Sequence, residues 1–219
     1  MQTPVVLNPL EQRNERLAVG VVRALESRHF EAYFCKTGEE ALARVLALIP
    51  ERESVSWGGS VTLEAIGLTK RLHECGRYDV LDRDQTTTPA ERFEATRQAL
   101  LCDNYLTSVN AISEDGQLVN VDGNGNRVAA MAFGPKRVIV VAGMNKVVKT
   151  SGDAVSRARH FAAPTNVQRI PSLAPPCRAT GACQDCKSLD SICSCIVTTR
   201  LCRPPGRIKV VLVGETLGF

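Results

Sequence analysis

The segment Ile208-Lys209-Val210-Val211-Leu212-Val213 decides the fold class of this 219-residue chain. Its apolar, β-branched residues run almost without interruption, which is typical of a central strand buried on both faces. Residues 138–142 repeat the pattern upstream. Helical patterns separate such short strands along the chain, and this alternation predicts a largely parallel sheet with helices on both faces. The predicted fold class is therefore α/β.

The remaining elements are predicted from apolar periodicity, caps and turn residues. Apolar residues at helical spacing place an amphipathic helix over about 8–27, and Thr37 with Glu40 begins another that ends at Pro50. Further helices are predicted over 58–75, 88–101 and 151–162, and Pro164 is expected to end the last one. Strands are predicted over 30–35, 54–57, 78–82, 105–112, 118–121 and 127–133.

Length and composition favour one domain that covers residues 1–219. The N-terminal helix is expected to lie across its outside, and a cysteine-rich insertion over about 171–205 precedes the last strand. The net charge of +4 is small, lysine and arginine are dispersed and aromatic residues are sparse, so nucleic acid is not an expected partner. The oligomeric state is left open.

The expected location is the cytoplasm. Residues 1–15 lack the charged and apolar regions of a secretory signal, and no apolar run approaches membrane-spanning length. The chain has nine cysteines, an odd number. Without an export signal, such a count is typical of a reducing compartment, and no membrane association is expected.

Six of the nine cysteines fall between Cys177 and Cys202. Four of them are spaced C-x5-C-x2-C-x6-C, namely Cys177, Cys183, Cys186 and Cys193. Thiolates at such spacings are typical ligands of zinc or of an iron–sulfur cluster, and the compact loop fits a 4Fe-4S cluster slightly better. A disulfide-linked loop and inert free thiols are the alternatives, and Cys195 and Cys202 remain as surplus thiols.

A second site is predicted at the ends of strands. Gly58, Gly59 and Ser60 follow a predicted strand and open a helix, a place where a phosphate or carboxylate can approach the backbone. Glu114 follows another strand, where it would act as a general base or a nucleophile. Further polar candidates for fixing a substrate are Asn110, Asp122, Asn126 and Arg127. Ordinary turns explain the same residues equally well.

Several motifs recur in order along nearly the whole chain. They are the runs 58–68, 109–120, 125–130 and 133–141, the pair Asn145-Lys146, the run 176–186 and the ending 213–218. Together they resemble the lactate-utilisation (LUD) domain family, and in particular its short cysteine-rich members of the lactate-utilisation protein C type.

The resemblance implies a Rossmann-like fold similar to the ribose-phosphate isomerase, glucosamine-phosphate deaminase and coenzyme A transferase group. In that group the turn that matches Trp57 to Ser60 contacts phosphate, and the coenzyme A transferase glutamate is similar in position to Glu114. Family members are linked to oxidation of L-lactate to pyruvate alongside iron–sulfur subunits.

Three functions are consistent with these features. The first is an accessory or electron-transfer component of L-lactate or organic-acid oxidation, with a four-cysteine iron–sulfur or metal site, a small anionic ligand and iron–sulfur oxidoreductase partners. The second is an isomerase or acyl-transferase that uses Glu114 on an anionic substrate, with a structural zinc loop. The third is a redox- or metal-sensing module without catalysis.

Overall fold

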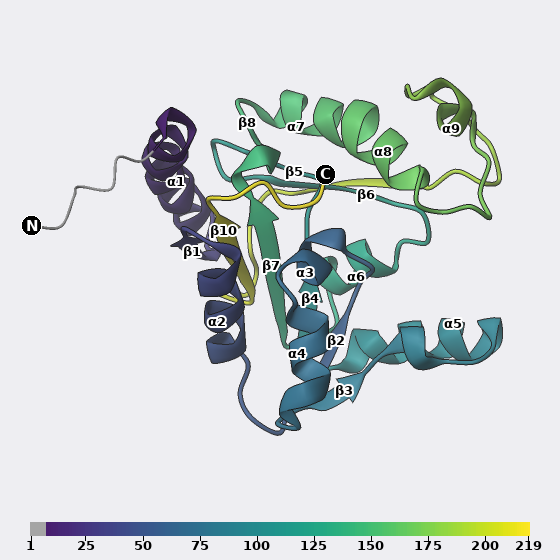
Figure 1. Ribbon diagram of the computed structural model, residues 1–219, viewed down its shortest axis with the longest axis horizontal. Helices are drawn as coiled ribbons and strands as arrows, with labels where there is room; N and C mark the ends of the chain where they lie inside the picture. The colour runs from purple at the N-terminus through teal and green to yellow at the C-terminus, as the bar shows by residue number, and fades with distance from the viewer. Residues whose placement is uncertain (1–7) are drawn as a thin grey trace, which may run out of the picture.

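The computed structural model describes residues 8–219 (Figure 1). Residues 1–7, part of the stretch predicted to carry no secretory signal, lie outside this description. The centre of the molecule is a six-stranded parallel sheet of order β1-β10-β7-β4-β2-β3. Its strands are β1 (Glu31–Cys35), β2 (Ser54–Trp57), β3 (Asp79–Leu81), β4 (Asn104–Thr107), β7 (Arg137–Gly143) and β10 (Ile208–Val213). The α/β prediction with a parallel sheet is confirmed.

The two most apolar strands lie side by side at the centre of this sheet. β10 is hydrogen-bonded between β1 and β7, in a register that pairs Val210 with Val140 and Val211 with Val141. Side chains of successive residues point to opposite faces of a strand. Val140 and Val210 therefore enter one core cluster, while Val141 and Val211 enter the other. Both faces are buried, which explains the continuous apolar sequence.

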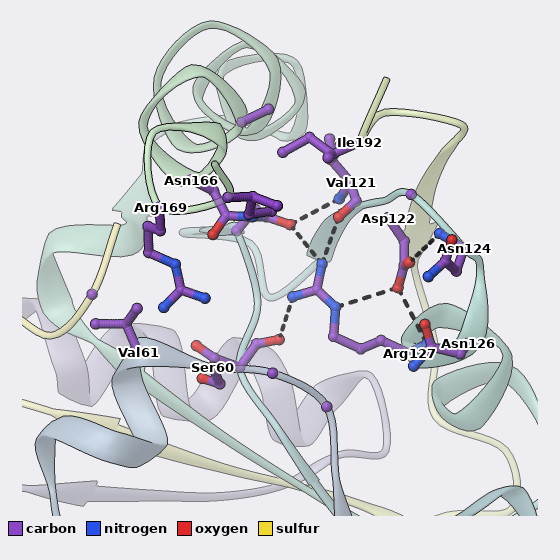
Figure 2. Close-up of a pocket in the computed structure, with 18 of the residues that line it drawn as sticks. Ser60, Val61, Val121, Asp122, Asn124, Asn126, Arg127, Asn166, Arg169 and Ile192 are labelled. Atoms are coloured by element: carbon purple, nitrogen blue, oxygen red, sulfur yellow. Dashed lines mark hydrogen bonds and ion pairs between the residues drawn. The ribbon is translucent and has the colours of Figure 1, made fainter. Parts of the chain in front are cut away.

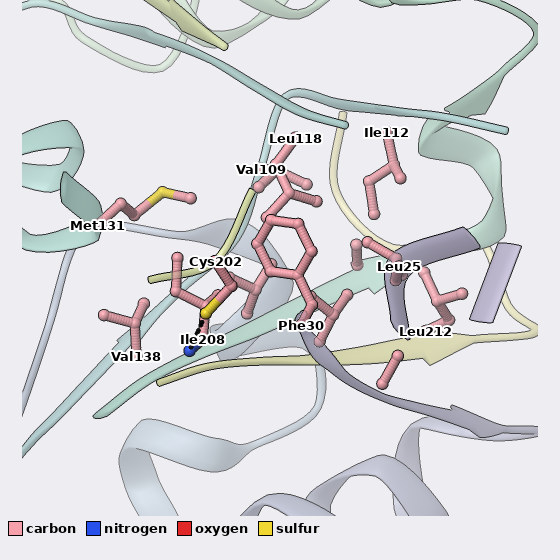
Figure 3. Close-up of a cluster of buried hydrophobic side chains, with 14 of the residues drawn as sticks. Leu25, Phe30, Val109, Ile112, Leu118, Met131, Val138, Cys202, Ile208 and Leu212 are labelled. Carbon is pink, nitrogen blue, oxygen red and sulfur yellow. Dashed lines mark hydrogen bonds between the residues drawn. The ribbon is translucent and has the colours of Figure 1, made fainter. Parts of the chain in front are cut away.

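Helices cover both faces of the sheet, as Figure 1 shows. On one side α1 (Pro9–Ser27) buries Ala18, Val21 and Leu25 against the core drawn in Figure 3. On the other side lie α2 (Gly38–Leu48), α3 (Val61–Ala65) and α4 (Leu68–Cys75). Short helical turns η1 (Arg83–Gln85) and η2 (Ala99–Leu101) flank α5 (Pro89–Gln98). None of the helices within residues 8–219 is long and apolar enough to cross a membrane.

A second sheet, which the sequence patterns did not predict, lies over the C-terminal ends of the central strands. Its order is β8-β5-β6-β9, from β5 (Ala111–Ser113), β6 (Leu118–Asp122), β8 (Val147–Val148) and β9 (Cys195–Thr199). Helices α7 (Ser151–Arg157) and α8 (Ala163–Val167) pack on it through small residues such as Ala154 and Ala163. The cysteine-rich insertion therefore contributes an edge strand, since β9 pairs with β6.

Two predicted strands were wrong. The expected strand over 105–112 divides, because β4 ends at Thr107 in the first sheet and β5 begins at Ala111 in the second. The expected strand over 127–133 is the helix α6 (Asn126–Ala132). Alanine favours helices, and the Asp122 carboxylate accepts hydrogen bonds from backbone amides just before and within the first turn.

Two predicted helix boundaries were also wrong. The helix expected over 58–75 is interrupted between α3 and α4 at Gly67, whose φ of 70° suits glycine. The helix expected to stop at Pro164 continues through a π-helical turn, η4 (Ala158–Ala162), into α8. Pro164 lies in the first turn of α8, where a missing backbone amide costs little.

Candidate functional site

A cavity of about 740 Å³ lies between the two sheets. The turn after β2, the segment between β4 and β5, and the turn after β6 form one side of it. The far side comes from α8 and from residues 189–192 of the cysteine loop. Seven residues predicted from the sequence line this cavity, namely Gly58, Gly59, Ser60, Asn110, Asp122, Asn126 and Arg127. Figure 2 shows several of them around the same space.

The glycine turn brings its backbone against large polar side chains. A Cβ at Gly58 would lie 3.0 Å from the Tyr105 hydroxyl, and one at Gly59 would lie 3.0 Å from a guanidinium nitrogen of Arg83. Neither glycine has a positive φ. At Gly58 the close Tyr105 hydroxyl favours a residue without a side chain, whereas the Arg83 guanidinium beside Gly59 is the end of a flexible side chain and can move. Ser60 accepts a hydrogen bond from the Leu63 amide, 3.4 Å away, and caps α3. With only five residues, α3 is too short for its dipole to define an anion site.

Arg127 ties two segments of the cavity together, the one between β4 and β5 and the one at the end of β6. Its guanidinium donates to the Ser108 carbonyl at 3.2 Å, to Asn110 Oδ1 at 3.2 Å and to the Val121 carbonyl. Its Nε lies 3.5 Å from Asp122 Oδ2, whose carboxylate is buried. Figure 2 shows these interactions as dashed lines. Arg127, Asn110 and Asp122 therefore shape the cavity, and most of their hydrogen-bonding capacity is used in doing so.

Lys146 is the buried cation of the cavity. Its side chain follows β7 on the turn η3 (Met144–Lys146) and the residue is 3% exposed. Nζ donates to Thr62 Oγ1 and to Ser108 Oγ, both at 2.9 Å. No carboxylate within residues 8–219 pairs with it. Burial first, and then the charges of Arg157 and Arg127, lower the pKa of Lys146 to about 7.

Two further cations face the cavity without an ion pair among the described residues. Arg83 has a buried Nε that has no hydrogen-bond partner there. Arg169 follows α8, stacks at 6.0 Å on the ring of Phe219 and projects into the space shown in Figure 2. Arg92 also lines the cavity, but it is paired with Asp84 at 2.6 Å. Unpaired guanidinium groups beside a buried ammonium suit an anionic ligand.

Glu114 is not among the residues that line the cavity. It follows β5, and its carboxylate is paired with Lys149 Nζ at 2.6 Å. Its predicted chemical role therefore has no support from its position. The histidine nearest the glycine turn is His73, whose Nε2 lies 3.0 Å from Asp82 Oδ2 beside Trp57 in a smaller hollow.

Cys177 lies within α9 (Pro176–Thr180), and the other three predicted metal ligands lie between α9 and β9. All nine cysteines are free thiols, and Cys177 is buried while the other three of the set are half-buried. Burial, and then thiolates at Cys183, Cys177 and Cys186, raise the pKa of Cys193 to about 11. The charges of the other three thiolates act on Cys193, so the four cysteines lie in the same region of the molecule. However, no three His, Cys, Asp or Glu side chains within residues 8–219 form a group that is ready to hold a metal ion.

The two surplus thiols differ in their surroundings. Cys202 is 1% exposed in the core of Figure 3, where its Sγ accepts a hydrogen bond from the Ile208 amide at 3.2 Å. Cys195 begins β9 beside the turn that contains Gly125. Cys202 is therefore a packing residue. The cysteine loop itself adjoins the cavity, because Ile192 lines it and Cys193 packs with Ile192 against the core cluster of the second sheet.

Sequence reasoning missed Lys146, Arg83 and Arg169. Lys146 carried two usable signals: it belongs to the Asn145-Lys146 motif, and it is a charged residue three positions after a buried apolar strand and just before a valine pair. Burial of such a lysine is rare without a functional reason. Arg83 and Arg169 lie in polar stretches, where nothing in the sequence distinguishes them from arginines that are exposed to solvent. Only the fold brings these three cations to one cavity.

Comparisons with known proteins identify the family. A sequence profile of the LUD domain matches residues 20–213. Among solved structures, the chain is similar to a DUF162 family protein from Deinococcus radiodurans, with a TM-score of 0.53 and 15% identity over 91% of this chain and 98% of that chain. At that identity the likeness shows the fold alone.

A weaker likeness is to eIF2B delta from Chaetomium thermophilum, with a TM-score of 0.31 and 21% identity over 50% of this chain and 48% of that chain. A TM-score this low does not establish a shared fold. No match was found among curated proteins. Because the LUD profile covers nearly all of the sequence, the chain belongs to the LUD domain family.

Proposed function

We propose that this LUD-domain protein binds a small organic anion, of the carboxylate or phosphate class, in the cavity beside Lys146. The observation that carries the proposal is the buried Lys146 ammonium, which has two hydroxyl partners and no carboxylate partner among residues 8–219. A buried charge without a counterion is costly, so a ligand anion would compensate it. Arg83 and Arg169 line the same cavity and offer further donors.

Within this proposal the protein is an accessory component of L-lactate or organic-acid oxidation. Membership of the LUD family supports the class of pathway, and the cationic cavity supports an organic acid as ligand. Iron–sulfur oxidoreductase subunits are the proposed partners. The isomerase or acyl-transferase alternative is less favoured, because Glu114 is engaged by Lys149 and does not line the cavity.

Calorimetric titration with L-lactate and with inorganic phosphate tests the binding proposal. We expect at least one of them to bind to wild type, and Arg169→Met to weaken that binding about tenfold through loss of a charged hydrogen bond. Glu114→Gln is the matched control and should bind as wild type does. Absence of binding by both anions, or equal affinity in Arg169→Met, would contradict the proposal.

A metal site in the cysteine loop is a second candidate function. The spacing of Cys177, Cys183, Cys186 and Cys193 within one short segment supports it. Soft thiolate ligands suit an iron–sulfur cluster or zinc. Since the thiols do not yet form a group ready to hold an ion, the loop would have to contract around it.

Metal and acid-labile sulfide analysis of anaerobically purified protein tests this candidate. We expect about four irons and four sulfides per chain for a cluster, or about one zinc for a structural site. Cys183→Ser should lose the metal, whereas Cys75→Ser, outside the loop, should keep it. Protein without metal, or metal content unchanged in Cys183→Ser, would rule the site out.

A further inference from the structure

Lys146 has the features of a reactive amine as well as of an anion-binding charge. Among the described residues it is the only lysine that lines the cavity. Two hydroxyls, Thr62 Oγ1 and Ser108 Oγ, fix its Nζ at 2.9 Å each, and Thr62 is 1% exposed. A carboxylate partner would hold the amine protonated, but none is present within residues 8–219. Because the two hydroxyls fix its orientation and no carboxylate there holds a proton on it, Nζ is available to react with a ligand.

The surroundings of Lys146 favour its neutral form. Arg127 is fixed on three carbonyl groups and Asp122, and Arg157 is half-buried and donates to the Asn110 carbonyl. Both guanidinium groups repel an ammonium at Lys146, and burial adds to the effect, so that the pKa of Lys146 falls to about 7. An exposed lysine is neutral about a thousand times less often at neutral pH. Desolvated lysines beside other cations are the ones that form imines with carbonyl substrates.

We propose that Lys146 Nζ forms an imine with the carbonyl carbon of an oxo acid bound in the cavity. The inference rests on the proposed function, because the ligand must first be an organic anion. Arg83 and Arg169 would hold its carboxylate, and the oxo group would lie toward Lys146. The ligand class is thereby narrowed from any small anion to a carboxylate that carries a ketone or aldehyde.

The reaction balances without an external oxidant or reductant. The Nζ lone pair forms a bond to the carbonyl carbon, and the π electrons of the carbonyl move to its oxygen. Nζ then gives up its two protons as the carbon–oxygen bond breaks, and the oxygen leaves with both of them as one water. The hydroxyls of Thr62 and Ser108 contact Nζ and are placed to pass these protons. The product is a neutral imine.

Reductive trapping tests the proposal on the wild-type protein. Incubation with pyruvate or glyoxylate and sodium cyanoborohydride would convert an imine to a secondary amine, and peptide mass spectrometry would locate it. We expect one adduct, at Lys146, with the mass of the oxo acid minus one water plus two hydrogens. Lys149 is the internal control, because it lies three residues away and its side chain is exposed. Lys146→Arg keeps the charge and should give no adduct.

The outcomes separate this inference from the proposed function. An adduct at Lys146 in a wild-type protein that also binds L-lactate or phosphate, with no adduct in Lys146→Arg, supports both. If those anions bind but neither oxo acid modifies Lys146, the imine is overturned and anion binding stands. Adducts spread equally over Lys149 and other exposed lysines would also overturn the imine. If neither L-lactate, phosphate nor an oxo acid binds, both proposals fail. Mapping on wild type keeps the test valid even if Lys146→Arg does not fold.

Discussion

Arg127→Met should lower the free energy of unfolding by about 3–5 kcal/mol, the cost typical of removing one partner from a buried ion pair. Asp122 would keep a buried charge, and the Ser108 and Val121 carbonyls would lose their donor. The loops after β4 and β6 would then lose their common anchor. Urea denaturation followed by circular dichroism measures this change directly.

Arg92→Met is the matched control for Arg127→Met. Arg92 lines the same cavity, but its pair with Asp84 is about half exposed on both sides, with side-chain exposures of 48% and 50%. Exposed pairs contribute about 0–1 kcal/mol, so this variant should stay close to wild type. Equal stability losses in the two variants would show that Arg127 does not hold the cavity in the way described.

Lys146→Met should stabilise the protein at low pH and lose this advantage at high pH. The pKa of Lys146 is lowered from 10.5 to about 7. Between these two values the unfolded chain binds more protons than the folded one, so the stability of wild type relative to Lys146→Met rises with pH. Below pH 7 the buried ammonium carries its full cost. Above about pH 10 the cost is gone because both states are neutral.

The expected gain for Lys146→Met is about 2–4 kcal/mol at pH 6, after an allowance of about 1 kcal/mol for each hydroxyl that loses its partner. Denaturation curves of both proteins from pH 6 to pH 10 measure it, and the difference between them cancels other titrating groups. Lys149→Met is the control, since Lys149 is exposed and should show no such trend. A difference that is independent of pH would contradict an uncompensated buried lysine.

The central sheet could be predicted from the sequence because its strands are buried on both faces. Residues such as Val140 and Val141 have to be apolar together, and that leaves a clear pattern. The second sheet leaves a weaker sequence pattern, since its strands are short and β8 has only two residues. The error over 127–133 has the same origin. Short apolar runs of valine and alanine suit either a strand or a helix until a cap such as Asp122 is in place.

The candidate site was predictable in part for a similar reason. Gly58 and Ser60 form the turn after β2, and parallel strands carry such turns to one edge of a sheet. The same rule placed Glu114 there, but β5 and β6 both belong to the second sheet, and Arg127 after β6 reaches the cavity whereas Glu114 after β5 does not. Lys146 was identified only as part of a motif, and its place in the cavity was not predicted because its neighbours Thr62 and Ser108 are 84 and 38 residues away in sequence. Contacts of that range depend on the fold.

The most direct test of the central claim is the pKa of Lys146 measured by heteronuclear NMR of its Cε–Hε groups, without ligand and with L-lactate or inorganic phosphate. Neither probe has a ketone or aldehyde, so neither can form an imine. We predict a pKa of about 7 in the free protein. With the anion bound the value should rise, because a nearby negative charge favours the ammonium. A pKa near the ordinary 10.5, or one that neither anion changes, would contradict an anion site at Lys146.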